Sequence, residues 1–93
     1  MFKDQIPSMP RFCNEVAASA KPELANPGPL IPCADDITEG WGLSFSISHT
    51  KSSTGRAAGS ASWGGLPNLF WFADREHGIG GMIASQILPF GGL

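Results

Sequence analysis

The chain has 93 residues with six Lys or Arg and eight Asp or Glu, which gives a formal net charge of −2. A chain of this length is at most one small domain, which buries only about 60–65% of its unfolded surface and has a small stability margin. The weak charge does not favour nucleic acid or an anionic membrane as a partner, and no basic cluster interleaves with aromatic residues.

Residues 1–5 lack the apolar core of a signal peptide, and no uninterrupted apolar run approaches the about 18 residues of a membrane-spanning helix. We therefore expect a soluble chain without a recognisable targeting signal, with the cytoplasm as the default compartment. Cys13 and Cys33 are too few to define a disulfide framework. Reduced, packed thiols are expected, and pairing stays open for a secreted chain.

Residues 1–40 predict an irregular connecting segment with little helix. Residues 11–21 contain helix formers but only a partial apolar stripe, so a short helix and an irregular segment both stay open. Four prolines between residues 22 and 40 exclude a regular element there. Such a long structureless stretch is uncommon in a free-standing domain, which suggests that it lies over something larger.

Residues 41–93 predict an antiparallel sheet of about four strands. In the first, 41–49, apolar and small or polar residues alternate with a period of two. Further strands are expected at 56–63, 68–74 and 79–88, and a polar turn at 75–78 ends in a glycine suited to positive φ. Because residues 68–74 are apolar on both faces, they predict a central, covered strand. The expected fold class is an α+β fragment, a β-meander after a Pro-rich segment.

The predicted sheet offers more apolar surface than one short helix can cover. The large apolar residues on it are Trp41, Phe45, Trp63, Phe70, Trp71, Phe72, Ile83 and Ile87. Left open, they would exceed the few hundred Å² of contiguous apolar surface that soluble monomers usually expose. We therefore expect either a missing domain or self-association.

Two adjacent glycines, Gly64 and Gly65, stand between Trp63 and Leu66 where a strand would normally fill space. Glycine inside a strand often marks the close approach of a ligand or of another backbone. A bulge or a tight link between strands explains the same pair. Both interpretations stay open on spacing alone.

Two motifs with the right residue types have the wrong spacing or setting. The residues of a possible zinc site, which lack its paired short spacings, are Cys13, Cys33, His49 and His77, so no metal or other cofactor is expected. Ser48 and Lys51 fit the S-x-x-K motif, but that pair meets only on a helix. Here it ends a predicted strand, so we interpret it as a chance match. His77, in the polar turn, is expected to be solvated.

The C-terminal half resembles the end of the β-lactamase-related serine hydrolases, which include class C β-lactamases, esterase relatives and fungal transesterase-like members. The matching segments contain W-G-G-L, an aromatic strand, D-R-E and S-Q-x-L-P-F, and lie at residues 40–43, 59–66, 67–76 and 81–90. Residues 2–29 resemble the connecting segment of the fungal members. The resemblance implies that residues 41–93 form the C-terminal part of a β-lactamase-like domain.

In that family the catalytic serine and lysine lie on an S-x-x-K helix, a tyrosine acts as base, and a third motif lines the acyl site. The resemblance implies that Trp63, Gly64 and Gly65 are this third motif and that the backbone N–H of Leu66 is one of two oxyanion donors. Trp63 replaces a lysine, which favours a neutral ester or acyl thioester as substrate over a charged β-lactam.

The chain departs from the family at its catalytic groups. It contains no tyrosine, it lacks an S-x-x-K helix, and the family's terminal helix is missing after Leu93. We therefore expect a part of a hydrolase or acyltransferase that is inactive alone. The alternative is a non-catalytic β-sheet module for binding or self-association.

Overall fold

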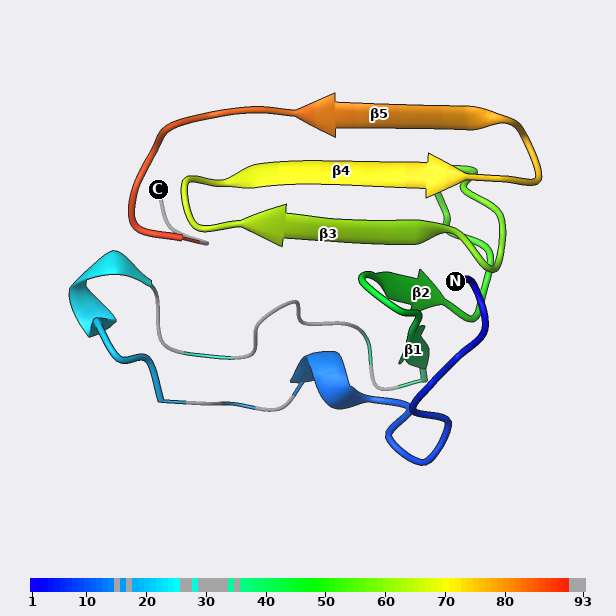
Figure 1. Cartoon of the computed structure of the whole chain (residues 1–93), viewed down its shortest axis with the longest axis horizontal. Helices are drawn as coiled ribbons and strands as arrows, with labels where there is room; N and C mark the ends of the chain where they lie inside the picture. The colour runs from blue at the N-terminus through cyan, green and yellow to red at the C-terminus, as the bar shows by residue number, and fades with distance from the viewer. Residues whose placement is uncertain (15, 17, 26–27, 29–33, 35, 91–93) are drawn as a thin grey trace.

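The computed structural model describes residues 1–14, 16, 18–25, 28, 34 and 36–90. Its centre is one sheet whose five strands lie side by side in chain order (Figure 1). The strands are β1 (Glu39–Trp41), β2 (Ser46–Ser48), β3 (Ala61–Gly65), β4 (Leu69–Asp74) and β5 (Ile79–Ile83). Each neighbouring pair is antiparallel, so the predicted β-meander is confirmed with five strands in place of about four.

Helical structure in the described part of the chain consists of two short 3-10 turns, η1 (Phe12–Asn14) and η2 (Pro22–Leu24). Within the predicted stretch 11–21, the described residues are therefore helical only in η1, and the irregular alternative is the better one. No helix among the described residues is long and apolar enough to cross a membrane. Cys33 lies outside the described residues, so the expectation of reduced thiols stays a prediction.

The stretch 41–49, predicted as a single strand, contains the last residue of β1, a tight turn and the whole of β2. The N–H of Gly42 donates to the carbonyl of Phe45 at 2.8 Å, which reverses the chain between β1 and β2. Glycine at position 42 lets the Met1 carbonyl and the Phe45 ring approach this turn closely. A Cβ there would collide with the Met1 carbonyl and would lie 2.8 Å from the Phe45 ring. The alternating pattern runs through the turn residues as well, so the pattern conceals the reversal.

The strand predicted at 56–63 begins later than expected and extends further. Residues 57–60 form a turn in which the Ser60 hydroxyl donates to the Ala57 carbonyl at 2.7 Å. Gly59 has a φ of 85°, a left-handed conformation that ends any extended run. Strand β3 therefore starts at Ala61 and continues through Gly64 and Gly65.

The strand predicted at 79–88 ends at Ile83 as β5. The following residues turn back over the β3–β4 turn, where the Ser85 hydroxyl donates to the Pro67 carbonyl at 2.6 Å. The chain then reaches the N-terminal segment, because the N–H of Phe90 donates to the Leu24 carbonyl at 2.9 Å. Residues 84–90 are thus a connecting arm and not a strand of the sheet.

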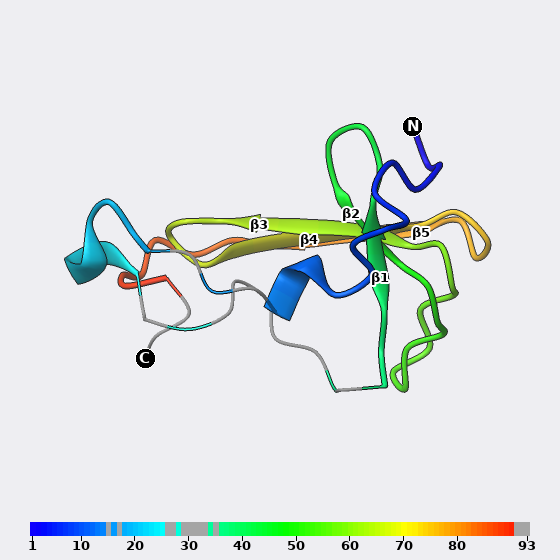
Figure 2. The ribbon, with the colours of Figure 1, turned by 90° about the horizontal axis from the view of Figure 1, so that it is seen from below.

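The core lies on one face of the sheet. Phe45, Ile47 and Ala61 are buried, and Phe2 and Trp71 pack against them. The opposite face of β4 is covered unevenly: Phe70 is 39% exposed, Arg56 lies over the ring of Phe72, and Asp74 is buried. Strand β4 is therefore central, but its second face is only partly covered, in contrast to the expectation of full cover on both. Figure 2 shows β3, β4 and β5 edge-on as one thin layer.

The two edges of the sheet differ. The N-terminal segment runs along β1 and makes three backbone hydrogen bonds in the region of this strand: Gln5 N–H to the Trp41 carbonyl at 2.7 Å, Glu39 N–H to the Pro10 carbonyl at 2.7 Å, and Leu43 N–H to the Met1 carbonyl at 3.2 Å. Strand β5 lies at the other edge, and Figure 1 shows no described segment beyond it.

Candidate substrate wall on strand β3

The W-G-G residues form the second half of β3. Trp63, Gly64 and Gly65 are paired with Trp71, Phe70 and Leu69 of β4. On the other side, β2 pairs with β3 only at Ala61 and Ser62 among the described residues. This half of β3 therefore has a strand neighbour on one edge, and the other edge extends beyond β2.

The direction of the backbone groups on that edge follows from the alternation of an antiparallel ladder. Ser48 N–H donates to the Ser60 carbonyl at 3.0 Å, so this carbonyl faces β2. In a strand, the N–H and C=O of one residue point to the same edge, and those of the next residue point to the opposite edge. Ser62 and Gly64 therefore face the same side as the Ser60 carbonyl. Leu66 begins the turn after β3, where the carbonyl of Gly65 accepts from the Asn68 N–H at 3.1 Å. The N–H of Leu66 belongs to the same trans peptide unit as this carbonyl and therefore points the opposite way, and the Leu66 side chain is 47% exposed.

Aromatic rings from three elements meet beside the W-G-G residues. The rings of Trp41 and Trp63 are perpendicular with centroids 4.7 Å apart, and Phe12 of η1 meets Trp41 edge-on at 5.8 Å. Perpendicular ring pairs at such distances are favourable because the positive edge of one ring faces the negative face of the other. The surroundings of Trp63 are therefore apolar and suit an uncharged ligand.

The two adjacent glycines differ in what surrounds them. A Cβ on Gly64 would lie 2.8 Å from the Leu69 carbonyl oxygen and 2.9 Å from Cδ1 of Phe70, so internal packing requires glycine at this position. A Cβ on Gly65 would meet nothing closer than Leu69 at 4.0 Å. Internal packing thus explains Gly64, whereas Gly65 leaves space beside the strand.

The turn that follows β3 is held by the connecting arm of residues 84–90. Asn68 has a φ of 60°, and its side-chain amide donates to the carbonyls of Ile87 at 2.8 Å and Pro89 at 3.2 Å. The Ser85 hydroxyl donates to the carbonyl of Pro67 within the same turn. The S-Q-x-L-P-F segment therefore contacts the turn that contains Leu66.

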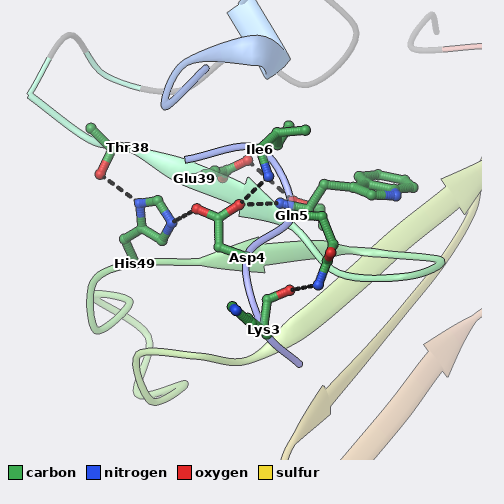
Figure 3. A network of polar contacts seen from close by, with 9 residues as sticks. Lys3, Asp4, Gln5, Ile6, Thr38, Glu39 and His49 are labelled. Atoms are coloured by element: carbon green, nitrogen blue, oxygen red, sulfur yellow. Dashed lines mark hydrogen bonds and ion pairs between the residues drawn. The ribbon is translucent and has the colours of Figure 1, made fainter. Parts of the chain in front are cut away.

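A polar network near the N-terminus joins residues that the sequence does not connect (Figure 3). Nε2 of His49 lies 3.0 Å from Oδ2 of Asp4, and Nδ1 of His49 lies 2.9 Å from the Thr38 hydroxyl. The backbone N–H groups of Ile6 and Trp41 donate to Oδ1 of Asp4. The hydrogen bond from Ile6 is the main cause that lowers the pKa of Asp4.

This network holds the N-terminal segment against β1 and the end of β2. Asp4 and His49 are 45 positions apart in the chain, so no local pattern indicates the contact. Both ring nitrogens of His49 have a polar neighbour, so the side chain joins the N-terminal segment to the residue before β1. Among the described residues, no group of three His, Cys, Asp or Glu side chains is arranged to hold a metal ion.

A second carboxylate–imidazole pair lies at the β4–β5 turn. Oδ2 of Asp74 lies 2.7 Å from Nδ1 of His77, and the backbone N–H of Ala57 donates to the same oxygen at 3.0 Å. The hydrogen bond from Ala57, followed by that from His77, lowers the pKa of Asp74 to about 2. The Asp74 carboxylate in turn raises the pKa of His77. The His77 side chain is 50% exposed, so it is solvated as expected but also bonded.

The Ser48 and Lys51 pair is not placed on a helix. Ser48 is the last residue of β2, and its hydroxyl lies 3.4 Å from the Ser60 carbonyl oxygen. Lys51 lies in the exposed loop that follows. The one-turn spacing that brings a serine and a lysine together on a helix does not apply to this arrangement.

No match to this chain was found among protein-family models, curated proteins or solved structures. The resemblance to the β-lactamase-related hydrolases thus remains a prediction from the sequence motifs.

Proposed function

We propose that this chain is the C-terminal part of a β-lactamase-related serine hydrolase or acyltransferase. In this role the chain supplies one wall of an acyl site in which an ester is hydrolysed or transesterified through an acyl-serine. Trp63, Gly64, Gly65 and Leu66 form the wall. The open space beside Gly65 is the single observation that carries the proposal, because no internal contact explains why this strand position lacks a side chain.

The chemistry of the wall suits an uncharged acyl group. A substrate beside Gly65 lies near the apolar ring of Trp63 and within reach of the strand's backbone. A backbone N–H directed at the developing oxyanion stabilises the transition state by roughly 3–4 kcal/mol. The N–H of Leu66 is the donor proposed for this role, and the connecting arm of residues 84–90 holds Asn68, two residues further on, in place.

The chain alone lacks the groups that form and break the acyl bond. It has no tyrosine, and Ser48 ends a strand, so Lys51 is not placed one helical turn away from it. A wall without nucleophile and base retains only binding and a small residual rate. A fluorophosphonate probe should therefore leave the chain unlabelled, and labelling of Ser48 would contradict the proposal.

Binding at the wall can be measured directly by amide NMR. Titration with phenyl butyrate, a neutral ester, should shift the Gly65 and Leu66 amide signals. In the Gly65→Ala variant, the added methyl should weaken these shifts without unfolding the chain. Ser53→Ala, in the exposed loop that follows β2 and outside the wall and β5, is the control and should behave as the parent chain. Shifts confined to other strands, or no saturable shift, would exclude an acyl wall at this position.

A second candidate function is supported by the apolar surface that remains open. From Phe70 onward, six large apolar residues are exposed among those that the structure describes: Phe70, Ile79, Met82, Ile83, Ile87 and Leu88. A non-catalytic module for binding or self-association would use this surface. Strand β5 carries three of the six.

A further inference from the structure

We propose that the outer edge of β5 binds β5 of a second copy of this chain, antiparallel and about a two-fold axis at Gly81. The result is a closed dimer with one continuous sheet. This inference goes beyond the acyl wall and gives the self-association candidate a defined surface and partner. The dimer does not require the acyl wall, because β3 and β5 are separated by β4.

The first observation is the contrast between the two sheet edges. The N-terminal segment covers the β1 edge with backbone hydrogen bonds from Gln5 to Trp41 and between Glu39 and Pro10. No described segment makes a backbone hydrogen bond to the outer side of β5 (Figure 1). Exposed strand edges are templates for pairing with another chain, and most proteins protect them. In the described part of the chain, one edge is protected and the other is open.

The second observation is which backbone groups are available at the open edge. Because the Ser60 carbonyl faces β2, alternation along β3 directs Trp63 toward β4, and its partner Trp71 back toward β3. Phe72, the next residue of β4, then faces β5 and its partner Gly81. The residues on either side of Gly81, namely Gly80 and Met82, direct their N–H and C=O groups outward.

These outward groups are self-complementary. With a two-fold axis at Gly81, Gly80 pairs with Met82 of the partner subunit, and Met82 pairs with the partner subunit's Gly80. Each pair exchanges two hydrogen bonds, which makes four in total across the axis. Ile79 then stands opposite the partner subunit's Ile83, so apolar side chains meet on both sides of the axis.

The side chains of the edge select an uncharged strand. From Gly78 to Leu88 the sequence has no charged residue and no proline, so it lacks the usual devices that prevent edge pairing. Ile79, Met82 and Ile83 are 58%, 70% and 73% exposed, and each is available for contact. A second β5 offers the same uncharged, apolar character. An isologous contact of this kind closes on itself, and the covered β1 edge prevents growth into a fibre.

The pairing of two five-residue strands is a small interface, well below the standard size of about 1,600 Å². The dimer should therefore be in a concentration-dependent equilibrium with the monomer. Main-chain hydrogen bonds supply much of the affinity in this mode of recognition, and side chains determine the partner.

Sedimentation equilibrium of the full chain over a wide concentration range tests the proposal. The weight-average mass should rise from 9.8 kDa toward twice that value and then level off. Met82→Lys places a charge at the pairing edge, where the side chain is exposed in the monomer, and should give the monomer mass at every concentration. The matched control, Leu43→Lys, changes a residue of similar exposure (65% against 70% for Met82) in the β1–β2 turn and should dimerise as the parent chain does.

Hydrogen exchange identifies the edge that is used. At high concentration the Gly80 and Met82 amides should become protected, and at low concentration they should exchange freely. A chain that stays monomeric throughout, or that grows into polymers, contradicts the proposal. The proposal is also contradicted if Met82→Lys still forms a dimer in which the amides of residues 80 and 82 exchange freely. The ester titration at Gly65 and Leu66 is read separately, so either proposal can fail while the other stands.

Discussion

The ring of Phe70 occupies the space that a side chain at Gly64 would need, with Cδ1 2.9 Å from the position of a Cβ. The neighbouring Gly65 has no such neighbour, although both glycines belong to the same motif and the same strand. The difference separates a glycine required by packing from a glycine available to a ligand, and stability measurements can detect it.

We expect Gly64→Ala to destabilise the fold and Gly65→Ala to leave it intact. The methyl at position 64 forces the Phe70 ring or the Leu69 backbone to move, and overpacking of this kind typically costs about 1–3 kcal/mol. At position 65 the methyl makes ordinary contact with Leu69, so the free energy of unfolding should change by less than about 1 kcal/mol. Urea unfolding of both variants measures the difference. Equal losses would show that Gly65 is also required by packing.

Stability should fall as the pH rises above neutrality, because of His77. The hydrogen bond with Asp74 raises the pKa of His77 above its usual value of 6.5 in the folded chain. The stabilisation by protonated His77 is therefore complete below pH 6.5 and is lost as the pH rises through the raised pKa. Urea unfolding between pH 5 and 9 should show this loss in the parent chain and not in His77→Gln. A parent curve without this loss would contradict the pairing.

In acid the same pair gives the opposite dependence through Asp74. Its pKa of about 2 lies below the usual 3.8, so its contribution is complete above about pH 4 and is lost as the pH falls toward 2. In Asp74→Ala the acid dependence from this group should be absent. The variant should also be less stable at neutral pH, because the buried Ala57 N–H loses its acceptor. If the variant unfolds altogether, the chemical shift titration of His77 in the parent chain still reports the pair.

Asn68 should contribute to the stability of the fold through both its backbone conformation and its side-chain hydrogen bonds. Asn68→Gly keeps the positive φ of 60° but removes the hydrogen bonds to Ile87 and Pro89, which contribute on the order of 1 kcal/mol each. Asn68→Ala removes the same bonds and adds backbone strain of about 1 kcal/mol or more. Thermal unfolding should therefore rank the parent chain above Asn68→Gly, and that variant above Asn68→Ala. The reverse order of the two variants would exclude the left-handed conformation.

Local patterns in the sequence predict the sheet well where the strands follow each other closely. The apolar run at 68–74 and the polar turn at 75–78 place β4 and the start of β5 within one residue of the structure. The same period-two pattern fails at 41–49, because the residues of the turn between β1 and β2 continue the alternation. It also fails at 56–60, where the left-handed Gly59 delays the strand.

The sequence likewise predicts some features of the candidate site and not others. The W-G-G motif and its place on a strand are visible in the sequence, because they are contiguous. The different environments of Gly64 and Gly65 are not, since they depend on the cross-strand position of Phe70. The contact between Asp4 and His49 bridges 45 positions, and only the folded backbone brings them together.

The way the N-terminal segment covers β1 has a consequence for the order of folding. Strands β3, β4 and β5 are joined by turns of three and four residues, and such hairpins form on the microsecond timescale. The contact between Asp4 and Trp41 closes a span of 37 residues, so its loop-closure entropy is larger than that of the hairpins. We expect it to form after the sheet onto which the N-terminal segment docks. We therefore expect the W-G-G half of β3 and the open edge of β5 to form first, and the N-terminal segment to dock on β1 last.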